Sequence, residues 1–160
     1  MSDENGIRVV EVPAMSVASF HAFGPSPEHL AFEKMKTWLE ARGVTRGSPP
    51  ARVFGFNNPS PSTGTPNYGY EFWVELRAGT PLAEAASQGD VVVKVFAGGK
   101  YAGLHHTGTG ETIPETWKRL VRLAATAGHG HAGHQWLEEH YLDLSSRSEI
   151  LSLDCLAPIR

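Results

Sequence analysis

Apolar and polar residues alternate along the stretch from Asn67 to Leu76, as they do in a strand with one buried face. The apolar positions are Tyr70, Phe72, Val74 and Leu76, and the opposite face carries Gly69, Glu71, Trp73 and Glu75. Side chains on one face recur at every second residue, so Glu71 and Trp73 project together, about 7 Å apart along the strand. On a solvated face they would be ordinary surface residues. On the wall of a groove they would suit a flat or cationic organic molecule.

Two other segments, 27–42 and 114–127, repeat their apolar residues with the period of a helix. The first stripe contains Ala31, Phe32, Met35, Trp38 and Leu39, and the second contains Trp117, Leu120, Val121, Ala124 and Ala127. Each segment starts with a proline near its first turn and is followed by a glycine, which are typical start and stop signals. Both segments are therefore predicted to be helices that bury one face.

The two halves of the chain resemble each other. Residues 10–24 and 93–108 each contain two β-rich runs joined by a short turn, and each predicts a β-hairpin. A predicted helix and then two predicted strands follow in both halves. These strands cover residues 52–56 and 70–76 in the first half, and 135–141 and 150–156 in the second. The matched order predicts a duplicated unit.

This duplication predicts an α+β fold, a tandem repeat of two strand-hairpin, helix and strand units. Repeat one covers about 7–76, a linker covers about 77–90, and repeat two covers about 91–160. A short helical turn is predicted within the linker at 81–86, and the proline-rich stretch 57–67 is predicted to be a loop. The alignment of the halves sets Glu71 against Ser152 and Trp73 against Asp154, which would keep the chemistry of the two repeats different.

Composition narrows the class of protein. The chain has 160 residues, 41% of them hydrophobic, which is enough for one domain with a proper core. A net charge of −3 argues against direct binding of nucleic acid. The single cysteine, Cys155, excludes an internal disulfide, fits a reducing compartment and is expected to be a buried, inert thiol. The polar, acidic residues 1–6 and the lack of a long apolar run indicate neither a signal peptide nor a membrane span, so a cytoplasmic location is expected.

Histidines raise the question of a metal site. His129, His131 and His134 lie in a glycine-rich stretch, and His140 follows. Imidazoles bind zinc and nickel well, but this stretch has no cysteine and no paired aspartate. We therefore expect no functional metal and no cofactor, although the sequence alone leaves binding of a metal by the 129–134 loop open.

Several motifs in a fixed order carry a resemblance to a known family. They are Val-Val-Glu-Val-Pro-Ala-Met-Ser-Val-Ala (9–18), Phe-Gly-Phe-Asn-Asn-Pro (54–59), Tyr-Gly-Tyr-Glu-Phe-Trp (68–73), Phe-Ala-Gly-Gly-Lys-Tyr-Ala (96–102), Ile-Pro-Glu-Thr-Trp (113–117) and His-Gln-Trp-Leu-Glu-Glu-His (134–140). Over about 7–160 the chain resembles the GyrI-like family. That family comprises small-molecule-binding effector domains of AraC- and MerR-type multidrug regulators and free-standing gyrase-inhibitor-like proteins.

The resemblance implies two sheets that meet around a pseudo-twofold axis and form a central groove for the ligand. In multidrug-sensing members, an acidic residue of the strand that matches 68–76 attracts lipophilic cations, and Glu71 matches that position. The chain lacks the DNA-binding domain that the regulators carry. We therefore expect a stand-alone member whose partner is a small hydrophobic or cationic aromatic molecule, and the sequence indicates no particular protein partner.

The strand pattern and the resemblance together select eight candidate ligand-binding residues. They are Glu71, Trp73, Tyr68, Phe56, Asn58, Tyr101, His105 and Trp136. A carboxylate among aromatic rings is partly desolvated, which raises its pKa unless a cation pairs with it. Such a group suits cation recognition, helped by cation–π attraction, or general acid–base catalysis. Tyr101 and Trp136 could equally be packing residues, and Glu71 could be a solvated strand residue.

Three functional hypotheses follow. The first is a stand-alone binding protein for hydrophobic, often cationic or aromatic, compounds. The second is a hydrolase of strained cyclopropane-bearing genotoxins, an activity of some free-standing members resembling this chain, with Glu71 as catalytic base and Trp73, Tyr101 and Trp136 around the ring system. The third is a gyrase-inhibitor-like interaction protein, which the low net charge favours least.

Overall fold

The computed structural model describes residues 6–145 and 149–160, so residues 1–5 of the acidic N-terminus lie outside the described part. The chain divides into two compact units. The Glu71 unit consists of residues 15–96 and a short segment from Leu142, and the Asp154 unit consists of the chain up to residue 14, residues 97–141 and the C-terminal residues from 149. Each unit mixes strands and helices, as an α+β fold requires.

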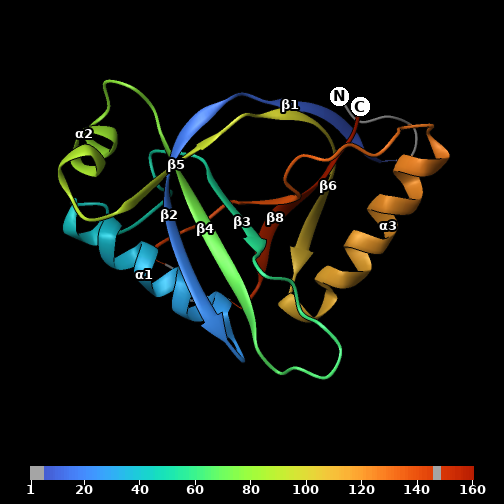
Figure 1. The fold of residues 1–160 in the computed structure, drawn as a ribbon, viewed down its shortest axis with the longest axis horizontal. Helices are drawn as coiled ribbons and strands as arrows, with labels where there is room; N and C mark the ends of the chain where they lie inside the picture. The colour runs from blue at the N-terminus through green and yellow to red at the C-terminus, as the bar shows by residue number, and fades with distance from the viewer. Residues whose placement is uncertain (1–5, 146–148) are drawn as a thin grey trace. The chain divides into compact units, whose positions relative to one another are not determined.

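The Glu71 unit is a four-stranded antiparallel sheet with helices beside it (Figure 1). Its elements are β2 (Met15–Gly24), α1 (Pro27–Ala41), β3 (Val53–Asn57), β4 (Tyr68–Leu76), α2 (Pro81–Gln88) and β5 (Val92–Phe96). The strands lie in the order β3-β4-β2-β5. The predicted loop 57–67 and the predicted short helix after Pro81 are both confirmed.

The Asp154 unit repeats this design. Its elements are β1 (Arg8–Val12), β6 (Gly99–Gly108), the 3₁₀ turn η1 (Gly110–Thr112), α3 (Ile113–Thr126), β7 (Leu137–His140) and β8 (Leu151–Pro158). The strands are antiparallel and lie in the order β1-β6-β8-β7, with α3 beside β6 and β8 (Figure 1). No helix in the described ranges is long and apolar enough to cross a membrane.

Each unit has its own hydrophobic core. In the Glu71 unit, the predicted apolar stripe of α1 packs on the predicted apolar face of β4, through Ala31, Met35, Leu39, Tyr70, Phe72 and Val74. In the Asp154 unit, Leu120 and Ala124 of α3 belong to a cluster with Leu153 and Cys155. Cys155 is fully buried, as predicted, and burial raises the pKa of its thiol far above the ordinary value. It is therefore an inert core residue.

The two predicted hairpins do not form. β1 pairs with β6 and β5 pairs with β2, so strands that are adjacent in sequence belong to different units. Gly98 does not form a hairpin turn. It lies where the backbone of residues 12–14 passes very close to it. A Cβ on Gly98, whose φ is +77°, would lie 2.5 Å from the Val12 carbonyl oxygen. A β-rich run fits any complementary edge, which is why local sequence could not distinguish exchange from a hairpin.

The register of the repeat also differs from the sequence alignment. His21 lies opposite Glu71, and His105, at the equivalent place in β6, lies opposite Asp154. The burial patterns of β2 and β6 are nearly identical, which supports this match. Glu71 therefore corresponds to Asp154 and not to Ser152. The alignment was shifted by two residues, since strand pairing, and not the similarity of short apolar blocks, fixes which residues correspond.

Candidate functional site

A cavity of about 800 Å³ opens at the edge of β2 in the Glu71 unit. It lies there because β5 pairs with β2 only over Met15–Ser19. From Phe20 onward, the outer edge of β2 has no strand partner in the described part of the chain. The Lys34 ammonium of α1 donates to the His21 carbonyl oxygen at 2.7 Å and so covers one of these edge groups. Side chains from both faces of β2 therefore line one space.

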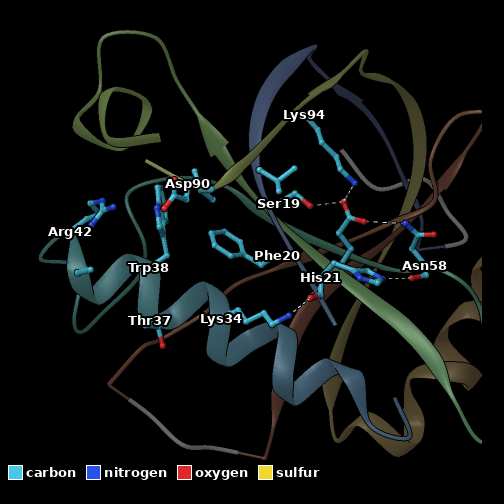
Figure 2. Close-up of a pocket in the computed structure, with 14 residues that line it drawn as sticks. Ser19, Phe20, His21, Lys34, Thr37, Trp38, Arg42, Asn58, Asp90 and Lys94 are labelled. Carbon is cyan, nitrogen blue, oxygen red and sulfur yellow. Dashed lines mark hydrogen bonds and ion pairs between the residues drawn. The ribbon is translucent and has the colours of Figure 1, made fainter. Parts of the chain in front are cut away.

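One end of the cavity is aromatic. The rings of Phe20 and Trp38 lie 5.6 Å apart and tilted, and the Arg42 guanidinium stacks 5.6 Å from the Trp38 ring. The exposed Asp90 lies at this end as well, as Figure 2 shows. The buried indole N–H of Trp38 has no hydrogen-bond partner within the described residues.

The other end of the cavity is built around Glu71, whose exposure is only 1%. Its Oε2 accepts hydrogen bonds from Ser19 Oγ at 2.7 Å, Trp73 Nε1 at 2.6 Å and Lys94 Nζ at 2.8 Å. Its Oε1 accepts one from Asn58 Nδ2 at 3.1 Å. In Figure 2, the contacts of Ser19, Asn58 and Lys94 converge on this carboxylate. Four donors, one of which is the Lys94 ammonium, therefore satisfy a buried charge.

These contacts decide the protonation state of Glu71. Burial, the largest effect, raises the pKa of this carboxyl, but hydrogen bonds from Lys94 and the three other donors lower it more. The net pKa lies below the ordinary value of 4.5. Glu71 is therefore an ionised hydrogen-bond acceptor with most of its lone pairs occupied, which makes it a weak base at neutral pH.

The loop after β3 is tied to the end of β4 beside this carboxylate. The His21 Nε2–H donates to the Asn58 carbonyl oxygen at 2.6 Å, and the Asn58 N–H donates to the Gly69 carbonyl oxygen at 2.8 Å. A Cβ on Gly69 would lie 1.8 Å from the Asn58 carbonyl oxygen, so only glycine permits this approach. The loop thus holds the Asn58 amide against Glu71.

The other candidates in this unit lie behind the cavity or away from it. Trp73 shares a face with Glu71, as predicted, but its ring packs edge-on against Phe56 at 4.6 Å, and neither ring is part of the cavity wall. Tyr68 donates its hydroxyl to Glu28 at 2.6 Å. Burial, with that contact, raises the pKa of Tyr68 to about 12. Of the predicted residues, Glu71 and Asn58 line the cavity directly.

Tyr101, His105 and Trp136 belong to the Asp154 unit. Tyr101 is fully buried and donates its hydroxyl to the Gln135 carbonyl oxygen at 2.5 Å. Trp136 is 39% exposed and lies 5.6 Å from the Trp117 ring. These three residues therefore do not line the cavity of the Glu71 unit.

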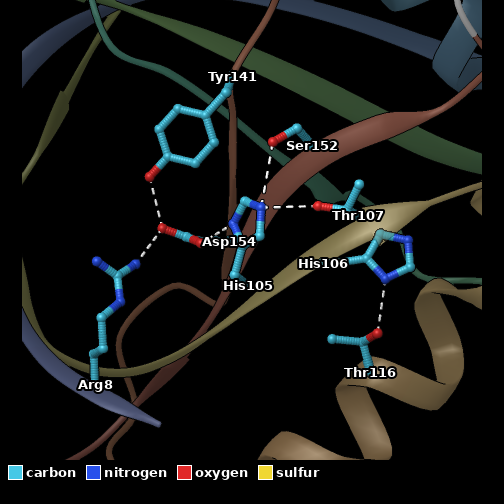
Figure 3. A network of polar contacts seen from close by, with 8 residues as sticks. All are labelled: Arg8, His105, His106, Thr107, Thr116, Tyr141, Ser152 and Asp154. Atoms are coloured by element: carbon cyan, nitrogen blue, oxygen red, sulfur yellow. Dashed lines mark hydrogen bonds and ion pairs between the residues drawn. The ribbon is translucent and has the colours of Figure 1, made fainter. Parts of the chain in front are cut away.

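Asp154 is the centre of a second polar cluster, shown in Figure 3. Its carboxylate accepts from the Arg8 guanidinium, from Tyr141 Oη at 2.6 Å and from His105 Nδ1 at 2.7 Å. Burial raises the pKa of Asp154, but the Tyr141 and His105 hydrogen bonds and the Arg8 charge outweigh it and lower the pKa overall. The other ring nitrogen of His105, Nε2, lies 3.1 Å from the Thr107 hydroxyl.

Known proteins share this architecture. Residues 8–154 match the family Cass2, described as integron-associated effector binding protein. The chain belongs to the Cass2 family. No curated protein matches the chain.

Solved structures of low identity share the fold. The EcmrR C-terminal domain has a TM-score of 0.67 at 12% identity, covering 96% of this chain and 96% of that one. SAV2435 bound to tetraphenylphosphonium has a TM-score of 0.57 at 12% identity, covering 96% and 93%. A hydrolase from Listeria innocua has a TM-score of 0.62 at 14% identity, covering 99% and 94%.

In this Cass2-family chain, the partners of the two carboxylates were not anticipated from sequence. Ser19 and Lys94 surround Glu71, and Arg8 and Tyr141 surround Asp154. One signal was present for Lys94, because a single cation interrupts the apolar run Val91 to Phe96. A charge within an apolar strand usually has a buried partner.

In the histidine-rich stretch, His134 makes contacts that hold the fold together. The His134 Nε2–H donates to the Lys100 carbonyl oxygen at 2.8 Å, and its ring lies edge-on to Tyr101 at 4.8 Å. Across residues 6–145 and 149–160, no group of three or more metal-ligating side chains is placed to hold an ion.

Proposed function

We propose that this Cass2-family chain is a binding protein for hydrophobic aromatic small molecules, which it holds in the cavity at the edge of β2. The observation that carries the proposal is the wall of that cavity. It combines a Phe20–Trp38 aromatic pair at one end with a fixed polar group, Glu71, at the other. Ligand sites typically have this design, a largely apolar space of 300–1,000 Å³ with a few placed polar groups.

The relatives support the same class of function. The family is described as an effector binding protein, and SAV2435, which shares the fold, is bound to tetraphenylphosphonium. The cavity at the edge of β2, at about 800 Å³, lies within the size range of small-molecule sites. Binding would serve sequestration of the compound or a signal to a partner.

Filling the cavity tests the proposal. Ala41 lines the cavity at the C-terminal end of α1 and is exposed, so Ala41→Trp should obstruct the aromatic end of the cavity without loss of the fold. Leu30→Trp places the same ring on an exposed site of α1 outside the cavity and is the matched control. We expect anilinonaphthalene sulfonate, followed by its fluorescence, to bind wild type and Leu30→Trp alike and to bind Ala41→Trp at least about tenfold more weakly. Equal binding by all three proteins would refute the site.

Hydrolysis with Glu71 as base is the less supported alternative. A hydrolase from Listeria innocua shares the fold, but at 14% identity. A general base needs a free lone pair and a pKa near the working pH. Glu71 instead has four hydrogen-bond donors and a lowered pKa. A bound ligand should therefore be recovered chemically intact.

A further inference from the structure

Lys94 already occupies the place that a ligand cation would take beside Glu71. Its Nζ lies 2.8 Å from Glu71 Oε2, and both residues line the cavity. The Lys94 side chain is 43% exposed, whereas that of Glu71 is 1% exposed, so the lysine is the partly solvated partner of a buried carboxylate. The one buried negative charge of the cavity is therefore paired before any ligand arrives.

A cation could use Glu71 only after Lys94 had left. It would have to replace a charge-assisted hydrogen bond, and a bulky lipophilic cation has no N–H with which to do so. Two cations beside one carboxylate would also repel each other in a partly desolvated space. Both effects lower the affinity for cations relative to ligands that leave the ion pair intact.

The remaining charges at the cavity point the same way. The residues that line the cavity include three basic side chains, Lys34, Arg42 and Lys94, but only two acidic ones, Glu71 and Asp90. Asp90 is exposed and shares its end of the cavity with Arg42, so water and a guanidinium both weaken its attraction for a cation. Of the three protons of the Lys94 ammonium, one is engaged with Glu71, and this is the only hydrogen bond of that group within the described ranges. The others can meet an anion.

We infer that Lys94 acts as a built-in counter-ion for Glu71, so that the cavity selects anionic aromatic molecules, such as aryl carboxylates or sulfonates, over lipophilic cations. This inference rests on the proposed function, because it assigns a charge preference to the same cavity. It departs from the expectation that Glu71 attracts cations.

Two probes of equal shape and opposite charge isolate the effect. Tetraphenylphosphonium and tetraphenylborate both present four phenyl rings around one central atom, so their contacts with Phe20 and Trp38 should be alike. Calorimetric titration in sodium buffer, which keeps the borate soluble, gives a Kd for each ion. The ratio of the two Kd values is then compared between variants. The intrinsic difference in hydrophobicity between the ions is the same for every variant and cancels in that comparison.

Three variants complete the design. Lys94→Met removes the counter-ion and keeps the length of the side chain. Lys34→Met removes another cavity-lining cation, one that binds a backbone carbonyl, and is the matched control for net charge. The double variant Glu71→Gln/Lys94→Met removes both members of the pair, so neither partner is left as an unpaired charge. It therefore also guards against misfolding of the single variant.

We expect wild type to favour the borate and Lys94→Met to shift the Kd ratio towards the phosphonium by at least about tenfold, the ratio that one charge-assisted contact is worth. The shift should be much smaller in Lys34→Met and absent from the double variant.

Binding of both ions with an unchanged ratio in Lys94→Met would overturn the inference and leave the proposed function standing. An equal shift in Lys34→Met would also overturn it, since general charge would then explain the preference. If wild type bound neither ion, both the inference and the proposed function would fall.

Discussion

At the scale of single residues, Glu71 shows how a buried charge acquires its surroundings. Taking a carboxylate out of water is costly unless a cation and hydrogen-bond donors replace the lost solvent. Here Ser19, Asn58, Trp73 and Lys94 supply those contacts, each from a different part of the Glu71 unit. The same contacts that stabilise the fold therefore fix the electrostatics of the cavity wall.

Gly69 is the residue on which the position of Asn58 depends. A methyl group there would overlap the Asn58 carbonyl oxygen and crowd His21 Nε2, which would lie 2.8 Å from it. We expect Gly69→Ala to lower the free energy of unfolding by about 1–3 kcal/mol, the usual cost of overpacking. Urea denaturation measures the loss, and ligand affinity should fall with it because the Asn58 amide moves away from Glu71.

Gly133→Ala is the control for that substitution, because a Cβ there would meet no atom within 4 Å. Its stability should stay within about 0.5 kcal/mol of wild type. A Gly69→Ala protein as stable as Gly133→Ala would mean that the loop can shift without cost.

At the scale of elements, the exchange of edge strands assembles both polar clusters. β5 pairs with β2 and not with its sequence neighbour β6, so that only β2 separates Lys94 from β4 and its Glu71. β1 pairs with β6, so that only β6 separates Arg8 from β8 and its Asp154. In two simple hairpins neither cation would lie in the same unit as the carboxylate that it now pairs with.

Cysteine pairs can test the exchange in solution. Ser16 and Val95 lie opposite each other on β2 and β5, and both are exposed. We expect Ser16→Cys/Val95→Cys to form a disulfide under mild oxidation, because directly opposed strand residues lie within the Cα separation that a disulfide spans. Mass spectrometry after tryptic digestion detects the linked peptides.

The control pair for this cross-link is Ser16→Cys/Val93→Cys, which lies two residues out of register, since Val93 is opposite Ala18. It should cross-link far more slowly, because the diagonal spacing exceeds the reach of a disulfide. Equal cross-linking of both pairs would argue against the β2–β5 register.

At the scale of the whole molecule, both units carry the same internal arrangement, a buried carboxylate opposite a histidine and paired with a cation from the exchanged strand. Glu71 with Lys94 and Asp154 with Arg8 are the two instances. The two pairs differ in their surroundings. Only Glu71 lines the cavity described above, whereas Asp154 is shared between Arg8, Tyr141 and His105.

This duplication predicts how stability depends on pH. The folded-state pKa values of Glu71 and Asp154 lie below their ordinary values of 4.5 and 3.8, so the unfolded chain binds protons more readily than the folded chain does. Their contribution to stability is therefore complete above about pH 5 and is lost as the pH falls through and below those values. Chemical denaturation at several pH values between 3 and 7 measures the slope.

The variant Glu71→Gln/Asp154→Asn should be less stable at pH 7 but should lose less stability on acidification than wild type. Exposed Glu84→Gln serves as the control and should keep the wild-type slope. Identical slopes for wild type and the double variant would show that other groups govern acid unfolding.

The sequence by itself determined the elements and the two sides of the key strand. Alternation along 68–76 and helical stripes in 27–42 and 114–127 depend on neighbours a few residues apart, and the structure has strands and helices there. Local pattern therefore also placed Glu71 and Trp73 on one face, and the Trp73 indole donates to that carboxylate. The duplicated order of elements was visible for the same reason.

Only the tertiary structure decided which strands pair and, through that, which charges meet. Lys94 and Glu71 are 23 residues apart, and Arg8 and Asp154 are 146 apart, so no local rule links them. Strand exchange and register fix these pairs, because a shift of two residues keeps every side chain on its face while changing its partner. The sequence thus offered Glu71 as a candidate carboxylate for a binding site, but its lysine counter-ion, and with it the charge preference that we infer, follows from the pairing of β5 with β2.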